Sequence, residues 1–203
     1  MTERIESEQS PRDSQLFQNA IARIDAANSE DRAQIDGEPA QVIYARRMTE
    51  ELKQLYPDAP ITLQLAARSQ HIRRWQIPRD SYPMTRAGYH QWRTKLYGFH
   101  AEQAGQILRE VGYEAETIAR VQGLLRKEKL KADPLMQSLE DVICVVFLKY
   151  EFAEFAQRHE EEKLLTILRR TWAKMSQVGR EAALQLNLPA EAMAIIAKAL
   201  APQ

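Results

Sequence analysis

The sequence predicts an all-α protein that forms a single helical domain. Only 7 of its 203 residues are glycine, and hydrophobic residues make up 44% of the chain. Ala, Leu, Glu, Gln, Arg and Lys dominate, which favours helix over sheet. Apolar residues recur at helical spacing, and no segment shows a convincing period of two. We expect a flexible N-terminus over residues 1–12 and one domain over residues 13–203, which is long enough to bury a full core.

The apolar stripes and end signals place the helices. The first is expected to begin at Asp13 or Ser14 and to end near Asn28, followed by a loop that reaches Pro39. A proline at the first helical position follows the predicted N-cap Asp133, and Gly112 is a predicted C-cap. Further helices are expected over residues 39–56, 60–71, 85–111, 114–131, 133–160, 161–175, 180–186 and 190–200, with His71 late in the third.

Charge and cysteine content limit the function classes. The 28 basic and 28 acidic residues give a formal net charge of zero, which argues against a general nucleic-acid coat. Cys144 is the only cysteine, so an internal disulfide is excluded and a reducing compartment is favoured. We find neither a signal peptide nor an apolar run of about 18 residues, and we expect a cytoplasmic protein without a membrane partner.

Possible metal ligands recur once in each of five successive predicted helices. Helical bundles assemble buried metal sites in this way, and His, Glu and Asp suit zinc, manganese or iron. The alternative is that these are unrelated polar residues at helix surfaces, as we expect of His90 and His159, which have polar neighbours. The candidate residues are Tyr44, His71, His100, Glu128 and Asp141.

An arginine-rich segment follows His71. Guanidinium groups match phosphate and carboxylate oxygens with two parallel hydrogen bonds, and aromatic rings nearby can stack on a base or sugar. We therefore expect an anion-binding loop. In the alternative, the arginines pair with Asp80, Glu102 or Glu140 and only hold the loop down. The predicted substrate-binding residues are Arg73, Arg74, Trp75, Arg79, Tyr82 and Lys127.

Several common catalytic motifs are absent. The sequence contains no Gly-rich phosphate loop, no nucleophile elbow and no Cys-x-x-Cys pair. It also lacks the two signature motifs of class I aminoacyl-tRNA synthetases, and Lys174-Met175-Ser176 is only a fragment of one. The chain is therefore not expected to be an aminoacyl-tRNA synthetase.

Seven short motifs make the chain resemble domain-of-unknown-function family 4202 over about residues 15–200. Members of this family are often labelled glutamyl-tRNA synthetases, a label that the missing motifs do not support. The resemblance implies a family but no activity. The motifs are His71-Ile-Arg-Arg-Trp-Gln-Ile-Pro-Arg79, Ser81-Tyr-Pro-Met, Arg86-Ala-Gly-Tyr, Trp92-Arg93, Phe99-His-Ala, Leu125-Arg-Lys-Glu-Lys-Leu and Leu139-Glu-Asp-Val.

The order of polar residues also resembles, more distantly, that of HD-domain metal-dependent phosphohydrolases. The resemblance implies an HD-like helical bundle with a metal held by His71, His100, Glu128 and Asp141. Tyr44 and Ile72 stand where that family has two further ligands, so one metal ion or none is expected in place of two.

Two functions remain open from the sequence, besides a purely structural role in which the arginines contact a partner. The first is a hydrolase of a phosphorylated small molecule or nucleotide, with His71, Glu128 and Asp141 as catalytic residues and manganese, iron or zinc as the metal. The arginine loop and Lys127 would hold the anionic group. The second is a non-catalytic module that binds an anionic ligand, such as a nucleotide or an RNA end.

Overall fold

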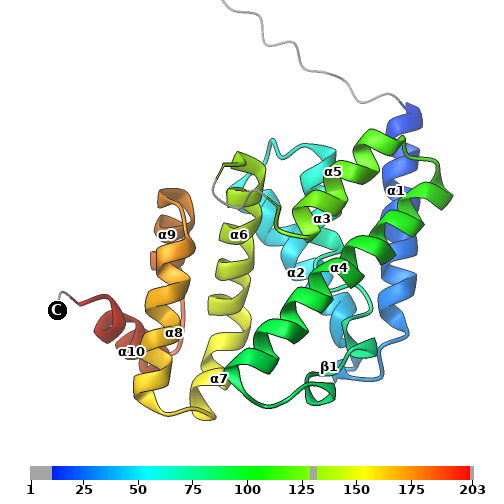
Figure 1. Cartoon of the computed structure of the whole chain (residues 1–203). Helices are drawn as coiled ribbons and strands as arrows, with labels where there is room; N and C mark the ends of the chain where they lie inside the picture. Colours follow the sequence, from blue (N-terminus) through cyan, green and yellow to red (C-terminus); the bar gives the residue numbers. More distant parts are fainter. Residues whose placement is uncertain (1–10, 129–131, 202–203) are drawn as a thin grey trace, which may run out of the picture. The chain divides into compact units, whose positions relative to one another are not determined.

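The computed structural model describes residues 11–128 and 132–201, and the fold class is all-α as predicted. Ten α-helices and one two-residue strand pair lie in these described ranges (Figure 1). The sequence predicts a flexible N-terminus over residues 1–12. Residues 1–10 lie outside the described ranges, and residues 11 and 12 belong to α1, Pro11–Ser29. Pro11 stands at the first position of that helix, where its missing N–H costs nothing.

The chain divides into two compact units, which are described separately. Unit 1 comprises Met1–Ala45 and Arg68–Arg126, and unit 2 comprises Arg46–Ala67 and Lys127–Gln203. Within unit 1, α1 and α5 both pack against α4. Besides α1, unit 1 contains β1 (Gln34–Ile35), β2 (Glu38–Pro39), the start of α2 (Ala40–Leu55), the 3₁₀ turns η1 (Arg74–Gln76) and η2 (Arg79–Ser81), α4 (Arg86–Val111) and α5 (Ala115–Leu125).

Local signals set both ends of α4. The side chain of Thr85 accepts a hydrogen bond from the amide of Gly88 at 3.1 Å, which is an N-cap. At the other end Gly112 has a φ of 104°, which favours glycine, and its amide donates to the carbonyls of Leu108 and Arg109. Both ends agree with the predicted range of 85–111 to within one residue.

A short hairpin replaces part of the loop predicted between the first two helices. Gln34 pairs with Pro39, and Ile35 pairs with Glu38, in antiparallel register. The two connecting residues, Asp36 and Gly37, both have positive φ, at 51° and 83°. Asp-Gly is the residue pair that such a two-residue turn favours, so the sequence did contain the signal.

Unit 2 is built around α6, the most apolar helix predicted from the sequence. α6 packs against α9 and α8, and α8 packs against α10. Asp133 caps α6 as predicted, with Pro134 at its first position, and Cys144 is buried within it. The elements are the rest of α2, α3 (Ile61–Arg68) up to Ala67, α6 (Pro134–Val146), the π-helical turn η3 (Phe147–Glu151), α7 (Phe152–Gln157), α8 (Glu161–Lys174), α9 (Gln177–Leu184) and α10 (Ala190–Leu200).

The π-helical turn η3 interrupts what the sequence predicts as one helix over 133–160. It directs two consecutive side chains to the same acceptor: Lys149 and Tyr150 both donate to Oε1 of Glu51, at 2.5 and 2.9 Å. Glu51 is only 2% exposed, so its carboxylate needs these donors. The guanidinium of Arg47 covers the ring of Tyr150 at 4.4 Å. The turn thus joins α2 to the helix that follows α6.

Asp141 joins three segments of unit 2. Its carboxylate is fully buried and accepts hydrogen bonds from the Tyr56 hydroxyl at 2.6 Å and from Gln137 Nε2 at 3.1 Å. The amide and the hydroxyl of Ser176, the N-cap of α9, also donate to it, at 2.8 and 2.5 Å. Burial and the bond to Asp141 raise the pKa of Tyr56 to about 12. Hydrogen-bond donors therefore satisfy this buried carboxylate.

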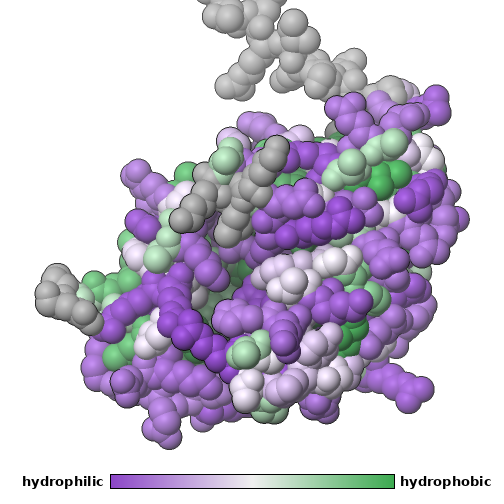
Figure 2. Space-filling view, in the orientation of Figure 1, coloured by the Kyte–Doolittle hydropathy of each residue, from purple (hydrophilic) through white to green (hydrophobic). Residues whose placement is uncertain are grey.

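Most of the surface that Figure 2 shows is hydrophilic. The large apolar side chains that are exposed among the described residues include Met84, Val178 and Leu184. Within the same residues, no helix has both the length and the apolar character needed to cross a bilayer.

Two glycines of α4 provide a matched test of helix packing. A Cβ on Gly98 would meet nothing within 4 Å, so Gly98→Ala should stabilise the protein by about 0.5–1 kcal/mol through helix propensity. A Cβ on Gly105 would lie 2.2 Å from Nε2 of Gln122, which donates to the carbonyl of Ala101. Gly105→Ala should therefore be about 1–3 kcal/mol less stable than Gly98→Ala in urea unfolding. Equal stabilities would contradict the packing of α5 on α4.

Asp141→Asn should destabilise unit 2, because the new amide group faces hydrogen-bond donors. We expect a loss of about 2–4 kcal/mol in the free energy of unfolding, measured by chemical denaturation. Asp58→Asn is the matched control, since Asp58 is exposed and should tolerate the change within about 0.5 kcal/mol. Similar small losses in both variants would show that Asp141 does not hold α9 in place.

Candidate functional site

His71 lies in the turn that follows α3, and not within the helix as the sequence predicts. The helix ends at Arg68, whose guanidinium forms a double hydrogen bond with Asp25 of α1 at 2.8 and 2.5 Å. Further along the turn, Arg73 has a φ of 51°, and its amide donates to Oδ1 of the buried Asn28 at 3.1 Å. These contacts hold the turn against the end of α1.

His100 reaches the same turn from α4. Its Nδ1 lies 2.8 Å from the carbonyl oxygen of Ile72. A carbonyl oxygen can only accept, so Nδ1 carries the proton in this bond. A neutral imidazole has a single N–H, and a neutral His100 therefore has a lone pair on Nε2.

Burial keeps His100 neutral. The side chain is 2% exposed, and desolvation is the main reason that its pKa falls from 6.5 to about 4. The bond to the Ile72 carbonyl opposes this shift, whereas the positive charge of Arg74 adds to it. At neutral pH the imidazole is therefore uncharged.

The Nε2 atom of His100 is buried and has no hydrogen-bond partner among the residues that the structure describes. An acceptor that is removed from water without a partner costs about 1–3 kcal/mol. Most buried polar groups in native proteins are satisfied, so such an atom calls for an explanation. It lies beside His71, whose ring centroid is 5.9 Å from that of His100.

Four side chains gather at this point and are called here the histidine cluster: Tyr44, His71, Arg74 and His100. The rings of Tyr44 and His71 stack at 3.9 Å between centroids, with 15° between their planes. Nη1 of Arg74 lies 3.0 Å from Nε2 of His71. Because guanidinium only donates, Nε2 of His71 accepts this bond. Tyr44, a candidate metal ligand from the sequence, therefore lies flat against His71.

Arg74 also lies against Trp92. Its guanidinium carbon is 4.7 Å from the centre of the Trp92 ring, and Trp92 Nε1 donates to the carbonyl of Ile77 at 2.9 Å. Trp92 thus holds the guanidinium of Arg74. Trp75 and Tyr82, which we expected to stack on a base or sugar, are half-buried. A single tryptophan on an amphipathic helix gives no sequence signal of this role.

The other two arginines of the predicted anion loop have partners within the protein. Arg73 donates to Glu30 at 3.1 Å and to Gln103 at 2.9 Å. Arg79 donates to three backbone carbonyls, those of Tyr82, Pro83 and Thr85, at 3.0, 2.8 and 3.3 Å. Both arginines hold loops in place, but their partners are not Asp80, Glu102 or Glu140, the acids considered from the sequence.

The remaining predicted residues belong to unit 2. Lys127 forms an ion pair with Glu140, and the two side chains are only 9% and 6% exposed. Glu128 is exposed, and the oxygens of Asp141 accept the bonds described above. The structure thus brings His71 and His100 together in unit 1, and it assigns Glu128 and Asp141 to unit 2. Among the described residues, no group of three or more His, Cys, Asp or Glu side chains that could hold a metal is found.

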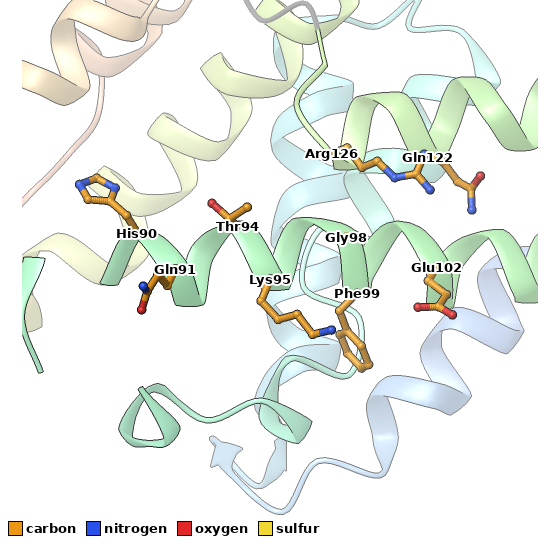
Figure 3. A pocket seen from close by; sticks show the side chains of 9 residues that line it. All are labelled: His90, Gln91, Thr94, Lys95, Gly98, Phe99, Glu102, Gln122 and Arg126. Atoms are coloured by element: carbon orange, nitrogen blue, oxygen red, sulfur yellow. The ribbon is translucent and has the colours of Figure 1, made fainter. Parts of the chain in front are cut away.

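A separate surface groove of about 950 Å³ lies along α4 and α5 (Figure 3). Gln122 and Arg126 come from α5 and its end, and the other lining residues come from α4. His90, which the sequence places on a solvated face, is among them, and no predicted site residue is. Those from α4 are His90, Gln91, Thr94, Lys95, Gly98, Phe99 and Glu102. The groove is therefore distinct from the histidine cluster.

The depressed pKa of His100 makes a testable contribution to acid sensitivity. Between pH 6.5 and 4 the unfolded chain binds a proton at this position and the folded chain does not, so stability falls as the pH falls. The wild type should lose about 3 kcal/mol more than His100→Asn over this interval, measured by urea unfolding. His90→Asn, at an exposed position, should keep the wild-type pH dependence. Identical profiles for wild type and His100→Asn would contradict a buried neutral imidazole.

Comparison with known proteins gives one match. The model of the family described as "Domain of unknown function (DUF4202)" matches residues 18–196. No curated protein and no solved structure was found to match the chain. The match covers most of the sequence and includes the seven motifs noted above. The chain belongs to this family, DUF4202.

Proposed function

We propose that the chain binds a phosphorylated small molecule at the histidine cluster. The observation that carries the proposal is the buried Nε2 of His100, which has a lone pair and no partner. A protein that keeps such an atom pays a free-energy penalty, which a bound ligand would remove. Strained or unsatisfied groups of this kind are found most often at functional sites.

The charge of the cluster favours an anionic ligand. Arg74 brings a permanent positive charge to it, and His100 is neutral. A guanidinium has five N–H donors, so Arg74 can bond to His71 and still contact a phosphate. Trp92 holds the guanidinium from the other side, which limits the entropy that is lost on binding.

A nucleotide or the end of an RNA chain carries the phosphate and hydroxyl groups that suit this site. The balanced net charge of the protein argues against contacts along a long RNA. A reducing, cytoplasmic setting fits both this ligand class and the buried thiol of Cys144, the only cysteine of the sequence.

The test is a titration of the purified chain with inorganic phosphate, sugar phosphates and nucleoside monophosphates, followed by calorimetry and melting temperature. Phosphorylated ligands should bind and raise the melting temperature. Arg74→Gln should weaken binding about 10- to 100-fold, because a charge-assisted bond to an anion is worth about 1.5–3 kcal/mol. Arg86→Gln removes an exposed arginine at the start of α4 and should change little. Absence of binding, or equal losses in both variants, would exclude the histidine cluster as the anion site.

A metal-dependent phosphohydrolase is the second candidate, and one observation favours it. Histidines that bind metals usually donate their other N–H to a carbonyl or carboxylate, and His100 makes such a bond to Ile72. Manganese, iron or zinc held by His71 and His100 would activate water for attack on phosphorus. The positive charge of Arg74 next to His71 opposes a cation there, so we place this function second.

Phosphate release from a panel of phosphate esters distinguishes the two candidates. The hydrolase predicts turnover that requires manganese, iron(II) or zinc and that falls by at least about 100-fold in His100→Asn. The binding module predicts tight binding without turnover, with or without metal. His159→Asn, which changes a half-buried histidine in unit 2, serves as the control for nonspecific metal effects.

A further inference from the structure

We propose that the ligand of the histidine cluster donates a hydrogen bond from a hydroxyl group to Nε2 of His100, in addition to its anionic contact with Arg74. The ligand class is thus a phosphorylated polyol or sugar, including the ribose phosphate of a nucleotide. This inference rests on the proposed function and adds the group that His100 selects.

The Nε2 atom of His100 is locked as a hydrogen-bond acceptor. Transfer of the proton to Nε2 would leave a lone pair on Nδ1 facing the Ile72 carbonyl oxygen at 2.8 Å, and two acceptors at this distance repel each other. Protonation of both nitrogens is opposed by burial and by the charge of Arg74. Nε2 therefore accepts a hydrogen bond and does not donate one.

The anionic group of the ligand cannot be the partner of Nε2. A fully ionised phosphate oxygen is also an acceptor, so it cannot satisfy Nε2 of His100. Arg74, in the same cluster, provides the donors that a phosphate needs. The two residues therefore require different chemical groups, and a single ligand satisfies both only if it carries an anion and a separate donor.

The turn before His71 contains two further buried oxygens. Among the described residues, Oγ of Ser69 and Oε1 of Gln70 find no hydrogen-bond partner, and these residues are 0% and 5% exposed. A ligand with several hydroxyl donors could satisfy such oxygens where it reached them, whereas a simple alkyl phosphate offers no hydroxyl donor.

The experiment compares ligands of equal charge that differ only in hydroxyl groups. The pairs are glycerol 3-phosphate with n-propyl phosphate, and adenosine 5′-monophosphate with its 2′,3′-dideoxy form. For the wild type, calorimetry should show at least one hydroxylated member binding about tenfold or more tightly than its partner. If both members of each pair bind equally, the hydroxyl inference is wrong and the anion site stands. If no phosphorylated probe binds, the proposed function and the inference both fail.

Two substitutions at His100 test whether Nε2 is the atom that distinguishes the hydroxylated ligand from its partner. An Asn amide nitrogen can occupy the position of Nδ1 and keep the bond to Ile72, but Asn places no acceptor at the position of Nε2. A Gln can place its oxygen there. The ratio of affinities within a pair should fall to about one in His100→Asn and recover in part in His100→Gln. An unchanged ratio in His100→Asn, with a native circular dichroism spectrum, would overturn the assignment. If both variants unfold, the wild-type pairs alone decide the matter.

Discussion

The hydrogen bond from Nδ1 of His100 to the carbonyl of Ile72 is the contact on which the histidine cluster depends. It joins α4 to the turn after α3. The acceptor, Ile72, lies in the sequence between His71 and Arg74, the two residues of the turn that contact each other in the cluster. The same bond selects the tautomer of His100 and so decides what its other nitrogen can bind. Asn28 holds the turn from the opposite side through the amide of Arg73. Because this turn lies between two anchors, the position of His71 relative to Arg74 is defined.

Asp141 in unit 2 and His100 in unit 1 are both buried polar side chains, and they differ in how many of their hydrogen-bonding atoms have partners. In unit 2 Asp141 accepts bonds from Tyr56, Gln137 and Ser176, and its role is to hold α6 to α9. In unit 1 His100 has one bonded nitrogen and one without a partner. Satisfied groups stabilise a fold, whereas an unsatisfied one costs free energy that a bound ligand or water molecule can recover. This difference directs the functional proposals to His100 and away from Asp141.

Short-range signals in the sequence were sufficient for most helices. Thr85, Gly112 and Asp133 act as caps within four residues of the groups that they bond, so their effects are local. The π-helical turn at Lys149 and Tyr150 was not predicted, and the side chains of both residues bond to Glu51, about one hundred residues earlier. The end of α3 at Arg68 likewise depends on contacts with α1, through Asp25 and Asn28. Helix propensity alone extends that helix to His71.

The sequence by itself determined the all-α class, the helices, their caps and the family, since all of these follow from local pattern and composition. It also pointed to His71 and His100 as a pair. Only the tertiary structure decided which atoms they present, because the partners of a side chain come from distant positions, as Ile72 does for His100 and Ser176 does for Asp141. For the same reason the arginines could not be sorted in advance. Arg73 and Arg79 stabilise loops, and Arg74 joins the histidine cluster, although all three look alike in the sequence.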